Sequence, residues 1–302
     1  MSSILVEQIG KKYGDVTALE DISFDVKKGE LFGLIGPDGA GKTSLFKILV
    51  TLLLPNSGRA SVEGMDVIKD YREIRQHIGY MPGKFSLYQD LSIEENLRFF
   101  ATVFNTTVEA NYEMIRDIYV QIEPFKKRRA GQLSGGMKQK LALCCALIHR
   151  PTVLFLDEPT TGVDAVSRKE FWDMLQTLKA QGITILVSTP YMDEAALCER
   201  IALIQHGKIL SVDTNAGIIS RFGKRLFAVR AQNTHQLLQD LRALPETHSC
   251  YPFGDSVHWA TTSETPNEKS LTDYLVSKSN GAVQVENIQP GIEDCFMDLM
   301  RK

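Results

Sequence analysis

The sequence predicts an α/β domain followed by a smaller α+β domain, and three observations carry that prediction. Residues 30–36 (ELFGLIG) and 153–156 (VLFL) are short apolar runs, as expected of strands buried inside a sheet. A glycine-rich segment at 36–43, GPDGAGKT, joins the first run to an apolar helical stretch at 44–54. Beyond residue 225, short strand and helix patterns alternate.

The bulk composition is that of an ordinary globular chain, long enough for one large and one small domain. It has 302 residues, of which 43% are hydrophobic and 24% charged. A net charge of −3 argues against a nucleic-acid-binding surface over the whole molecule. Five cysteines without metal-ligand spacing indicate reduced thiols. Charges near the N-terminus argue against a secretory signal, and the longest apolar run, 48–54, is far shorter than the ~20 residues of a membrane-spanning helix.

The segment GPDGAGKT fits the pattern G-x-x-x-x-G-K-[ST], in which a glycine-rich loop presents backbone N–H groups to phosphate. Ordinary amino-acid usage gives about 0.01 chance matches in a chain of this length, so a chance glycine turn is disfavoured. Lys42 is expected to reach the β- and γ-phosphates, and the Thr43 hydroxyl to bind Mg²⁺. The predicted nucleotide contacts are Gly36, Pro37, Asp38, Gly39, Ala40, Gly41, Lys42, Thr43 and Ser44.

The N-terminal part shows the pattern of an antiparallel layer. Apolar and polar residues nearly alternate at 4–9 and 18–26, which predicts half-buried strands, and residues 59–68 continue the layer with a turn at Gly64. Tyr13 lies between the first two strands. Taken alone, it is best interpreted as a surface aromatic in a hairpin turn.

The segment after this layer is predicted to be mainly helical. A helix that begins near Arg72 gives way to a loop at Met81-Pro82-Gly83. A second helix starts at Ser92, which has the spacing of a capping box with Glu95.

Two further helices are expected, at 109–123, where Pro124 stops the helix, and after the segment LSGGM at 133–137. Ser134 is the natural N-cap of the latter, and the two glycines after it let another molecule approach the helix N-terminus. By itself this pattern is equally consistent with any flexible helix entry. The basic run 126–129 lacks interleaved aromatic residues, which favours a solvated face over a nucleic-acid site.

Asp157 and Glu158 directly follow the apolar run at 153–156. Carboxylates at the carboxyl end of a buried parallel strand lie where open α/β sheets bind ligands. Asp157 is therefore expected to hold Mg²⁺ and Glu158 to polarise an attacking water, and the upstream phosphate loop disfavours the alternative of a helix-capping acidic pair. The elements expected next are a helix at 165–180, a strand at 183–189, a helix at 192–198, and a hairpin over 200–210 that turns at His206-Gly207.

The composition changes near residues 215–225, where Asn215, Gly217 and Gly223 indicate a linker. A small α+β domain, of the ferredoxin-like type, is expected after it. Its expected elements are a strand at 226–231, a helix at 234–243, a strand pair across 249–261, a helix at 268–278, a strand at 282–288 and a helix at 291–301.

The phosphate loop, LSGGM and VLFLDEP occur in this order, and together they resemble the ATP-binding subunit of an ABC transporter over residues 1–215. The resemblance implies a P-loop NTPase fold with a RecA-like core, an antiparallel β subdomain and a helical subdomain at about 84–150. A linker at 216–225 and an accessory α+β domain at 226–302 would follow. It also implies an ATPase that works with Mg²⁺ as a head-to-tail dimer, with two ATP molecules at the interface.

Roles can be carried over motif by motif. Lys42 and Glu158 are similar to the catalytic lysine and glutamate, and Asp157 to the aspartate that holds the metal. Tyr13 resembles the aromatic residue that stacks on adenine. The remaining matches are Ser134, Gly135 and Gly136, similar to the signature that contacts the γ-phosphate bound by the opposite subunit, and Asp164, similar to the D-loop aspartate at the dimer interface.

GPDGAGKT, IGYMP, LSGGMKQK, STPYMDEA and the terminal EDCFMDLM resemble bacterial type-2 exporters, especially the daunorubicin-resistance and YbhF-like branch. This resemblance implies multidrug export through a separate integral membrane permease. It also implies a peripheral position on the cytoplasmic face of the inner membrane, with residues 87–90 near the surface that meets the permease. No nucleic-acid partner is expected.

Three positions depart from the family pattern. Gly83 stands where the family normally has the Q-loop glutamine, and Pro190 where it has the switch histidine. Neither residue has a side-chain donor, and losing one positioned donor can lower a rate by about 10²–10³. Asp38 replaces the commoner asparagine or serine and adds a negative charge near the triphosphate. A homodimer would repeat both losses, so a heterodimer with a second ABC ATPase is favoured.

Two alternatives stay open at this point. One is a subunit that binds nucleotide but is catalytically inactive, which Gly83 and Pro190 would explain. The other is a non-transport ABC ATPase, which the single cassette, the lack of a heptad tract and the net negative charge disfavour.

Overall fold

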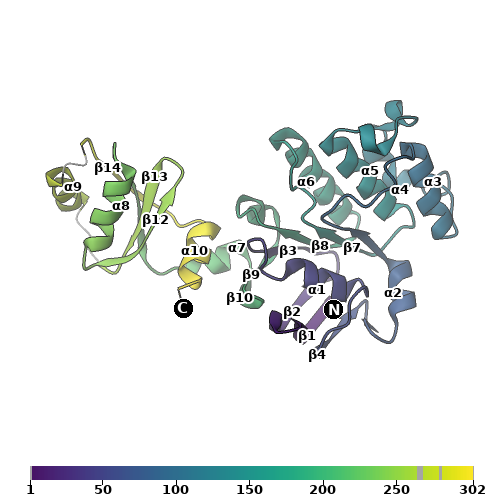
Figure 1. Ribbon diagram of the computed structural model, residues 1–302, viewed down its shortest axis with the longest axis horizontal. Helices are drawn as coiled ribbons and strands as arrows, with labels where there is room; N and C mark the ends of the chain where they lie inside the picture. Colours follow the sequence, from purple (N-terminus) through teal and green to yellow (C-terminus); the bar gives the residue numbers. More distant parts are fainter. Residues whose placement is uncertain (1, 264–267, 279–280, 302) are drawn as a thin grey trace. The chain divides into compact units, whose positions relative to one another are not determined.

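The computed structural model describes residues 2–263, 268–278 and 281–301. It separates into two units, Met1–Asn215 and Ala216–Lys302, which are described in turn. Most of the helices and strands are labelled in Figure 1.

An antiparallel sheet forms one layer of the first unit, with strand order β2-β1-β4-β5. The alternating segments predicted as strands are confirmed, and Gly64 makes the predicted turn with φ +77°. The strands are β1 (Ser2–Tyr13), β2 (Val16–Lys27), β4 (Ser57–Val62) and β5 (Met65–Asp66).

A six-stranded sheet of order β10-β9-β3-β8-β7-β6 forms the second layer. Its neighbouring strands are parallel except for the hairpin of β9 and β10, which turns at His206-Gly207 as predicted. Its strands are β3 (Leu31–Ile35), β6 (Ile78–Met81), β7 (Val153–Asp157), β8 (Thr184–Thr189), β9 (Arg200–Gln205) and β10 (Lys208–Asp213).

One strand of this sheet, β6, was not expected, because a helix running into a loop was predicted there. The segment has only four residues and includes Gly79, so it shows no strand pattern of its own. Its strand conformation comes from pairing with β7, in which Met81 lies opposite Leu156.

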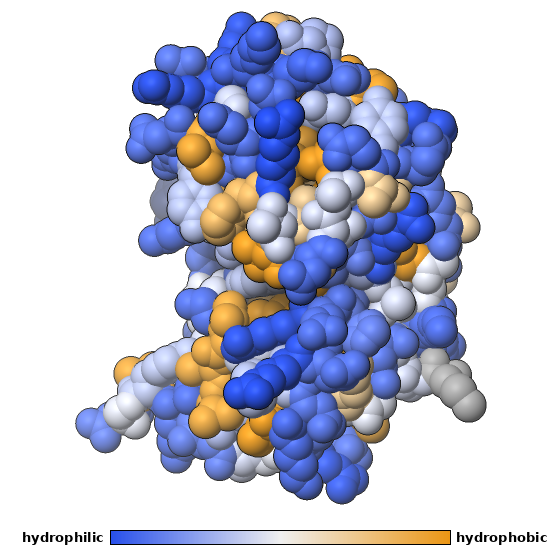
Figure 2. Space-filling view, turned by 90° about the vertical axis from the view of Figure 1, so that its right-hand side faces the viewer, coloured by the Kyte–Doolittle hydropathy of each residue, from blue (hydrophilic) through white to orange (hydrophobic). Residues whose placement is uncertain are grey.

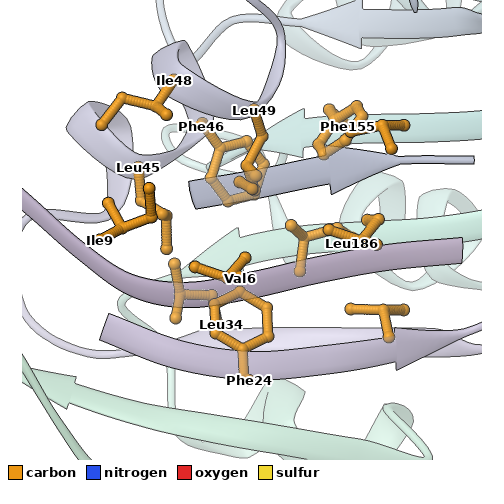
Figure 3. Packing of buried hydrophobic residues seen from close by; sticks show 14 of the residues in the cluster. Val6, Ile9, Phe24, Leu34, Leu45, Phe46, Ile48, Leu49, Phe155 and Leu186 are labelled. Atoms are coloured by element: carbon orange, nitrogen blue, oxygen red, sulfur yellow. The ribbon is translucent and has the colours of Figure 1, made fainter. Parts of the chain in front are cut away.

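Helix α1 (Lys42–Leu49) lies between the two sheets and is the centre of the core. Figure 3 shows Leu45, Phe46 and Leu49 packed among side chains from both layers. Phe46 meets Phe155 edge to face, with ring centroids 6.1 Å apart. Burying an aromatic side chain of this kind contributes about 1.5–3 kcal/mol. The core therefore fixes the loop that precedes α1 relative to the strand ends around it.

The buried helix predicted at 44–54 is too long, because α1 ends at Leu49. Thr51 has φ +64°, which a continuing α-helix cannot accommodate. Leu52 and Leu54 consequently leave the core, and their side chains are 58% and 64% exposed.

The remaining helices of the first unit agree with most of the predictions. Ser92 and Glu95 form the predicted capping box. The helix predicted at 109–123 is shorter, since it ends at Tyr119, and Pro124 lies in a separate 3₁₀ turn (Glu123–Phe125). The helix predicted at 192–198 is a 3₁₀ helix (Asp193–Leu197). The others are α2 (Tyr71–His77), α3 (Ile93–Val103), α4 (Tyr112–Tyr119), a 3₁₀ turn at Ala130–Gln132, α5 (Gly135–Leu147) and α6 (Ala165–Ala180).

The second unit has the ferredoxin-like order of elements, strand-helix-strand-strand-helix-strand, in an antiparallel sheet of order β12-β13-β11-β14. Trp259 is fully buried in its core beside Phe227. The elements are β11 (Arg225–Arg230), α8 (Thr234–Ala243), β12 (Thr247–Phe253), β13 (Ser256–Thr261), α9 (Glu268–Ser277), β14 (Gln284–Ile288) and α10 (Ile292–Leu299).

Part of the segment predicted as a linker is helical: α7 spans Asn215–Ser220. The Asn215 side chain donates to the carbonyl oxygens of Ala195 and Cys198, which fixes the start of this helix. Glycine content alone therefore overstated the irregularity of this segment. Within the described ranges, no helix is both long enough and apolar enough to cross a membrane.

Candidate nucleotide site

The predicted site residues converge at the carboxyl ends of three neighbouring parallel strands. The glycine-rich loop leaves β3, Asp157 ends β7, and Thr189 ends β8. In the sheet Ile35 lies opposite Thr189, and Asp157 lies opposite Ser188. Segments that are 122 and 154 residues apart in the chain, counted from Ile35 to Asp157 and to Thr189, thus meet at the sheet edge where open α/β folds bind ligands.

Two glycines of the loop stand where no side chain fits. A Cβ on Gly36 would lie 2.2 Å from the carbonyl oxygen of Ile204, and one on Gly41 would lie 2.5 Å from that of Ala18. Gly41 also has φ +106°, a conformation natural only to glycine. These close approaches hold the loop against β9 and β2, so that its backbone can surround a small anion.

The N-terminus of α1 is open to such an anion. Gly41 occupies the N-cap position and offers no side-chain acceptor. Within the described part of the chain, the backbone N–H groups of Lys42, Thr43 and Ser44 make no backbone hydrogen bond. Free N–H groups and the positive end of the helix dipole together favour phosphate binding.

The Lys42 ammonium is buried and folded back over the loop. Its Nζ donates to the carbonyl oxygens of Gly36 at 2.7 Å and Pro37 at 2.9 Å, and lies 3.0 Å from Glu158 Oε1. The predicted catalytic pair is therefore in direct contact. A triphosphate in the loop would compete with the Glu158 carboxylate for this cation.

Ser188 contacts both residues of the acidic pair, Asp157 through its carboxylate and Glu158 through its backbone N–H. Its hydroxyl donates to Asp157 Oδ1 at 2.7 Å and accepts from the Glu158 backbone N–H at 3.0 Å. The Glu158 N–H also lies 3.1 Å from the Ser188 carbonyl oxygen. Glu158 adopts φ +52°, a strained conformation that these bonds stabilise.

Gly83 and Pro190 lie beside this acidic pair and the loop. A Cβ on Gly83 would be 3.0 Å from the Asp157 carbonyl oxygen and 3.8 Å from Glu158 Cβ. Pro190 follows Thr189, whose carbonyl oxygen accepts from the Gly36 N–H at 3.3 Å. Both positions thus adjoin the candidate site, and neither carries a polar side chain.

A buried carboxylate missed by the sequence reasoning braces the segment that contains Pro190. Glu194 is 2% exposed. It accepts from the Thr160 hydroxyl at 2.8 Å and from the Thr189 hydroxyl. For Ser188 and Thr189 the available signal was a pair of polar side chains at the end of an otherwise apolar strand, whereas Thr160 and Glu194 lie outside the strands and carried no such signal.

Tyr13 lies next to the loop, as the adenine-stacking prediction requires. Its hydroxyl is 3.3 Å from Ser44 Oγ, and its ring is 47% exposed. The Lys11 ammonium lies 5.3 Å from the ring centroid. Asp38 is exposed at the tip of the loop. An exposed aromatic ring at the rim of a phosphate loop is suited to stack on a base.

Ser134, Gly135, Gly136 and Asp164 form a second group. Ser134 caps α5, and its hydroxyl accepts from the Met137 N–H. Gly136 packs against α6, where a Cβ would lie 2.6 Å from Ser167 Oγ. Asp164 caps α6, and hydrogen bonds from the Ser167 N–H and its neighbours lower the pKa of this carboxyl. The signature segment and the D-loop segment therefore lie side by side.

The residues present fit a magnesium ion that is bound mainly by phosphate and water. Thr43 offers a hydroxyl and Asp157 a buried carboxylate, which are hard oxygen donors of the kind Mg²⁺ prefers. Among the described residues, no cluster of three or more histidine, cysteine or acidic side chains could hold a metal by itself. A site completed by nucleotide phosphates is consistent with both observations.

The chain is similar to several transporter ATP-binding proteins over most of its length. It is 44% identical over 213 residues to the probable multidrug ABC transporter ATP-binding protein YbhF of Escherichia coli, covering 70% of this chain but only 37% of that protein. The Nod factor export ATP-binding protein I of Burkholderia orbicola is 37% identical over 254 residues, covering 80% of this chain and 84% of the relative. The doxorubicin resistance ATP-binding protein DrrA of Mycobacterium tuberculosis is 36% identical over 263 residues, covering 84% and 80%.

Solved structures of ABC transporter ATP-binding proteins are also similar to this chain. An ATP-binding subunit of an ABC transporter is 27% identical, with a TM-score of 0.67, covering 74% of this chain and 94% of that one. The cbiO1 protein of Clostridium perfringens, part of the ABC transporter complex cbiONQ, is 25% identical with a TM-score of 0.65, covering 73% and 92%. Residues 19–161 match the model of the ABC transporter family. The chain therefore belongs to the ABC transporter family, among its ATP-binding proteins.

Proposed function

We propose that this chain binds and hydrolyses Mg·ATP in a head-to-tail dimer and thereby drives a separate membrane permease of a bacterial exporter. The permease, and not this chain, would select the transported substrate. The names of the relatives, multidrug and doxorubicin resistance among them, support efflux of small organic molecules. The working position is the cytoplasmic face of the inner membrane.

The observation that carries the proposal is the convergence of loop, lysine and acidic pair at one sheet edge. Lys42 Nζ lies in the loop and contacts Glu158, while Asp157 and Thr43 supply oxygen donors. Mg²⁺ bound with the nucleotide would neutralise phosphate charge. Lys42 would bind the β- and γ-phosphates, and Glu158, released from Lys42, would orient water for attack.

The dimer is supported by the position of the second group of residues. Ser134, Gly135 and Gly136 lie beside the segment of Asp164, and among the described residues no hydrogen bond joins them to the chain's own phosphate loop. An exposed helix N-terminus with two glycines is suited to meet the γ-phosphate held by another subunit. We infer that the signature segment of this chain contacts the ATP that is bound by the partner subunit.

We further propose that the chain's own ATP site is degenerate. Gly83 and Pro190 adjoin Asp157, Glu158 and the loop, and they place no side-chain donor there. Each missing donor can lower the rate by about 10²–10³. A second, different ABC ATPase that carries its own glutamine and histidine would give the assembly one competent site. A catalytically inactive, nucleotide-binding subunit is the second candidate, and the same two positions favour it.

An apolar region on the first unit supports a protein partner. Figure 2 faces the side on which α2 and α3 lie and shows hydrophobic surface gathered in a hollow across it. Tyr88 and Phe99 are 50% and 39% exposed, and their rings lie 4.7 Å apart. Exposed apolar patches on soluble domains mark interaction sites.

Co-purification from native membranes tests the assembly. The full chain, tagged and expressed at its natural level, should bring down one integral membrane protein and one second ABC ATPase. Recovery of the permease with no second ATPase would support a homodimer and remove the proposed asymmetry. Recovery of neither would contradict the exporter assignment.

A further inference from the structure

Ser188 is a buried polar residue inside an apolar strand, directly opposite Asp157. It belongs to β8, in the run Thr184–Thr189, and is 0% exposed. In the parallel pairing of β7 and β8, Ser188 is the register partner of Asp157. A hydroxyl at such a position must be hydrogen-bonded, because an unsatisfied buried polar group is costly.

The single hydroxyl proton of Ser188 is used on Asp157 Oδ1, at 2.7 Å. The serine oxygen in turn accepts from the Glu158 N–H at 3.0 Å. One side chain therefore fixes the rotation of the predicted metal ligand and the backbone of the predicted catalytic glutamate. With Oδ1 engaged, Asp157 Oδ2 is the oxygen left to face a metal.

We propose that Ser188 is a positioning residue that orients Asp157 for Mg²⁺, an inference that rests on the proposed ATP site. Removing a residue that hydrogen-bonds to a metal ligand and orients it typically lowers metal affinity or activity 10–100-fold. Ser188 is fully buried and its hydroxyl is engaged by Asp157 and the Glu158 N–H, so its effect is exerted through the carboxylate.

The alternative role is purely structural, since Ser188 also satisfies the Glu158 N–H. A structural loss would soften the strand and lower nucleotide and metal binding together. A positioning loss would weaken metal binding and leave the affinity for metal-free nucleotide unchanged, because among the described residues the Ser188 side chain makes no hydrogen bond to the phosphate loop that follows β3.

The test compares Ser188→Ala with a matched control in the same strand, Thr184→Val. Thr184 is also 0% exposed, and its hydroxyl accepts from the Gly29 N–H at 3.0 Å, at the opposite end of β8 from the site. Affinity for a fluorescent ATP analogue is measured in EDTA. Affinity for Mn²⁺, used as the paramagnetic probe, is then measured by electron paramagnetic resonance at saturating non-hydrolysable ATP analogue.

We expect Ser188→Ala to bind Mn²⁺ 10–100-fold more weakly, with metal-free nucleotide affinity within threefold of wild type and Thr184→Val unchanged in both. Ser188→Cys has a side chain of similar size whose thiol is a weaker hydrogen-bond donor, so its Mn²⁺ affinity should be intermediate. This variant also tests the proposal if the alanine variant does not fold. Mn²⁺ affinity within threefold of wild type in the folded variants would overturn the proposal. So would an equal Mn²⁺ loss in Thr184→Val. If the wild-type chain binds no nucleotide, the proposed function fails first, and this outcome is distinct from both.

Discussion

Replacing Lys42 by alanine should weaken ATP binding without unfolding the chain. The Lys42 side chain is 2% exposed, and its ammonium has three partners in the free chain: the carbonyl oxygens of Gly36 and Pro37, and the Glu158 carboxylate. On ATP binding, phosphate oxygens would replace the carboxylate. The variant therefore loses the principal cation of the phosphate site.

The size of the effect follows from these contacts. A hydrogen bond to a charged group contributes about 1.5–3 kcal/mol, and part of that gain is offset by the Glu158 contact that Lys42 gives up. A net loss of about 1.4–2.8 kcal/mol corresponds to roughly 10- to 100-fold weaker binding. Titration with a fluorescent ATP analogue measures it directly.

Lys47→Ala is the matched control, because Lys47 is an exposed lysine of the same helix. It should bind the analogue like wild type. If Lys42→Ala, folded by circular dichroism, also binds within threefold of wild type, the assignment of the phosphate loop is wrong.

Three further predictions concern the rest of the chain. A chain ending near residue 220 should stay soluble and keep its ATP affinity, and soluble protein without binding would contradict the division into units. Trp259→Ala should destabilise the second unit by about 3–5 kcal/mol in urea unfolding while ATP binding persists, because the ring is fully buried and its Nε1 donates to Thr247. Burial raises the pKa of Cys250 to about 12 and of Cys295 to about 11, so both thiols are more protonated at pH 8 than free cysteine. Iodoacetamide should therefore label the native chain poorly, as mass spectrometry can check. The free energy of unfolding should fall as the pH rises above about 8.5, because the unfolded thiols then ionise and the buried ones do not. Rapid native labelling would contradict the burial of these side chains.

Sequence reasoning located the elements whose signals are local. The strand, glycine loop and helix around Lys42, the capping box of Ser92 and Glu95, and the His206-Gly207 turn all depend on neighbouring residues, and all are present. The helix after Gly41 was predicted to extend to residue 54 because Leu52 and Leu54 are hydrophobic and were expected to be buried, whereas both are exposed.

The contacts that complete the site were beyond that reasoning because they depend on strand order. Nothing local in ITILVST indicates that β8 lies between β3 and β7, and only that order brings Ser188 to Asp157 and Thr189 to the loop. β6 was missed for the same reason, since four residues become a strand only beside β7. Glu194 lies in the segment predicted as a helix at 192–198, and only the fold brings Thr160 and Thr189 to its carboxylate.

The central claim, a slow ATP site in an asymmetric pair, is tested most directly by steady-state hydrolysis. Three samples are compared: the purified chain alone, the chain with its co-purifying ATPase partner and permease, and that complex with Glu158→Gln in this chain. We expect weak activity alone, strong activity in the complex, and only partial loss on the substitution, because the partner's site would retain its own glutamate. Rapid hydrolysis by the isolated chain, abolished by Glu158→Gln, would contradict the asymmetric account.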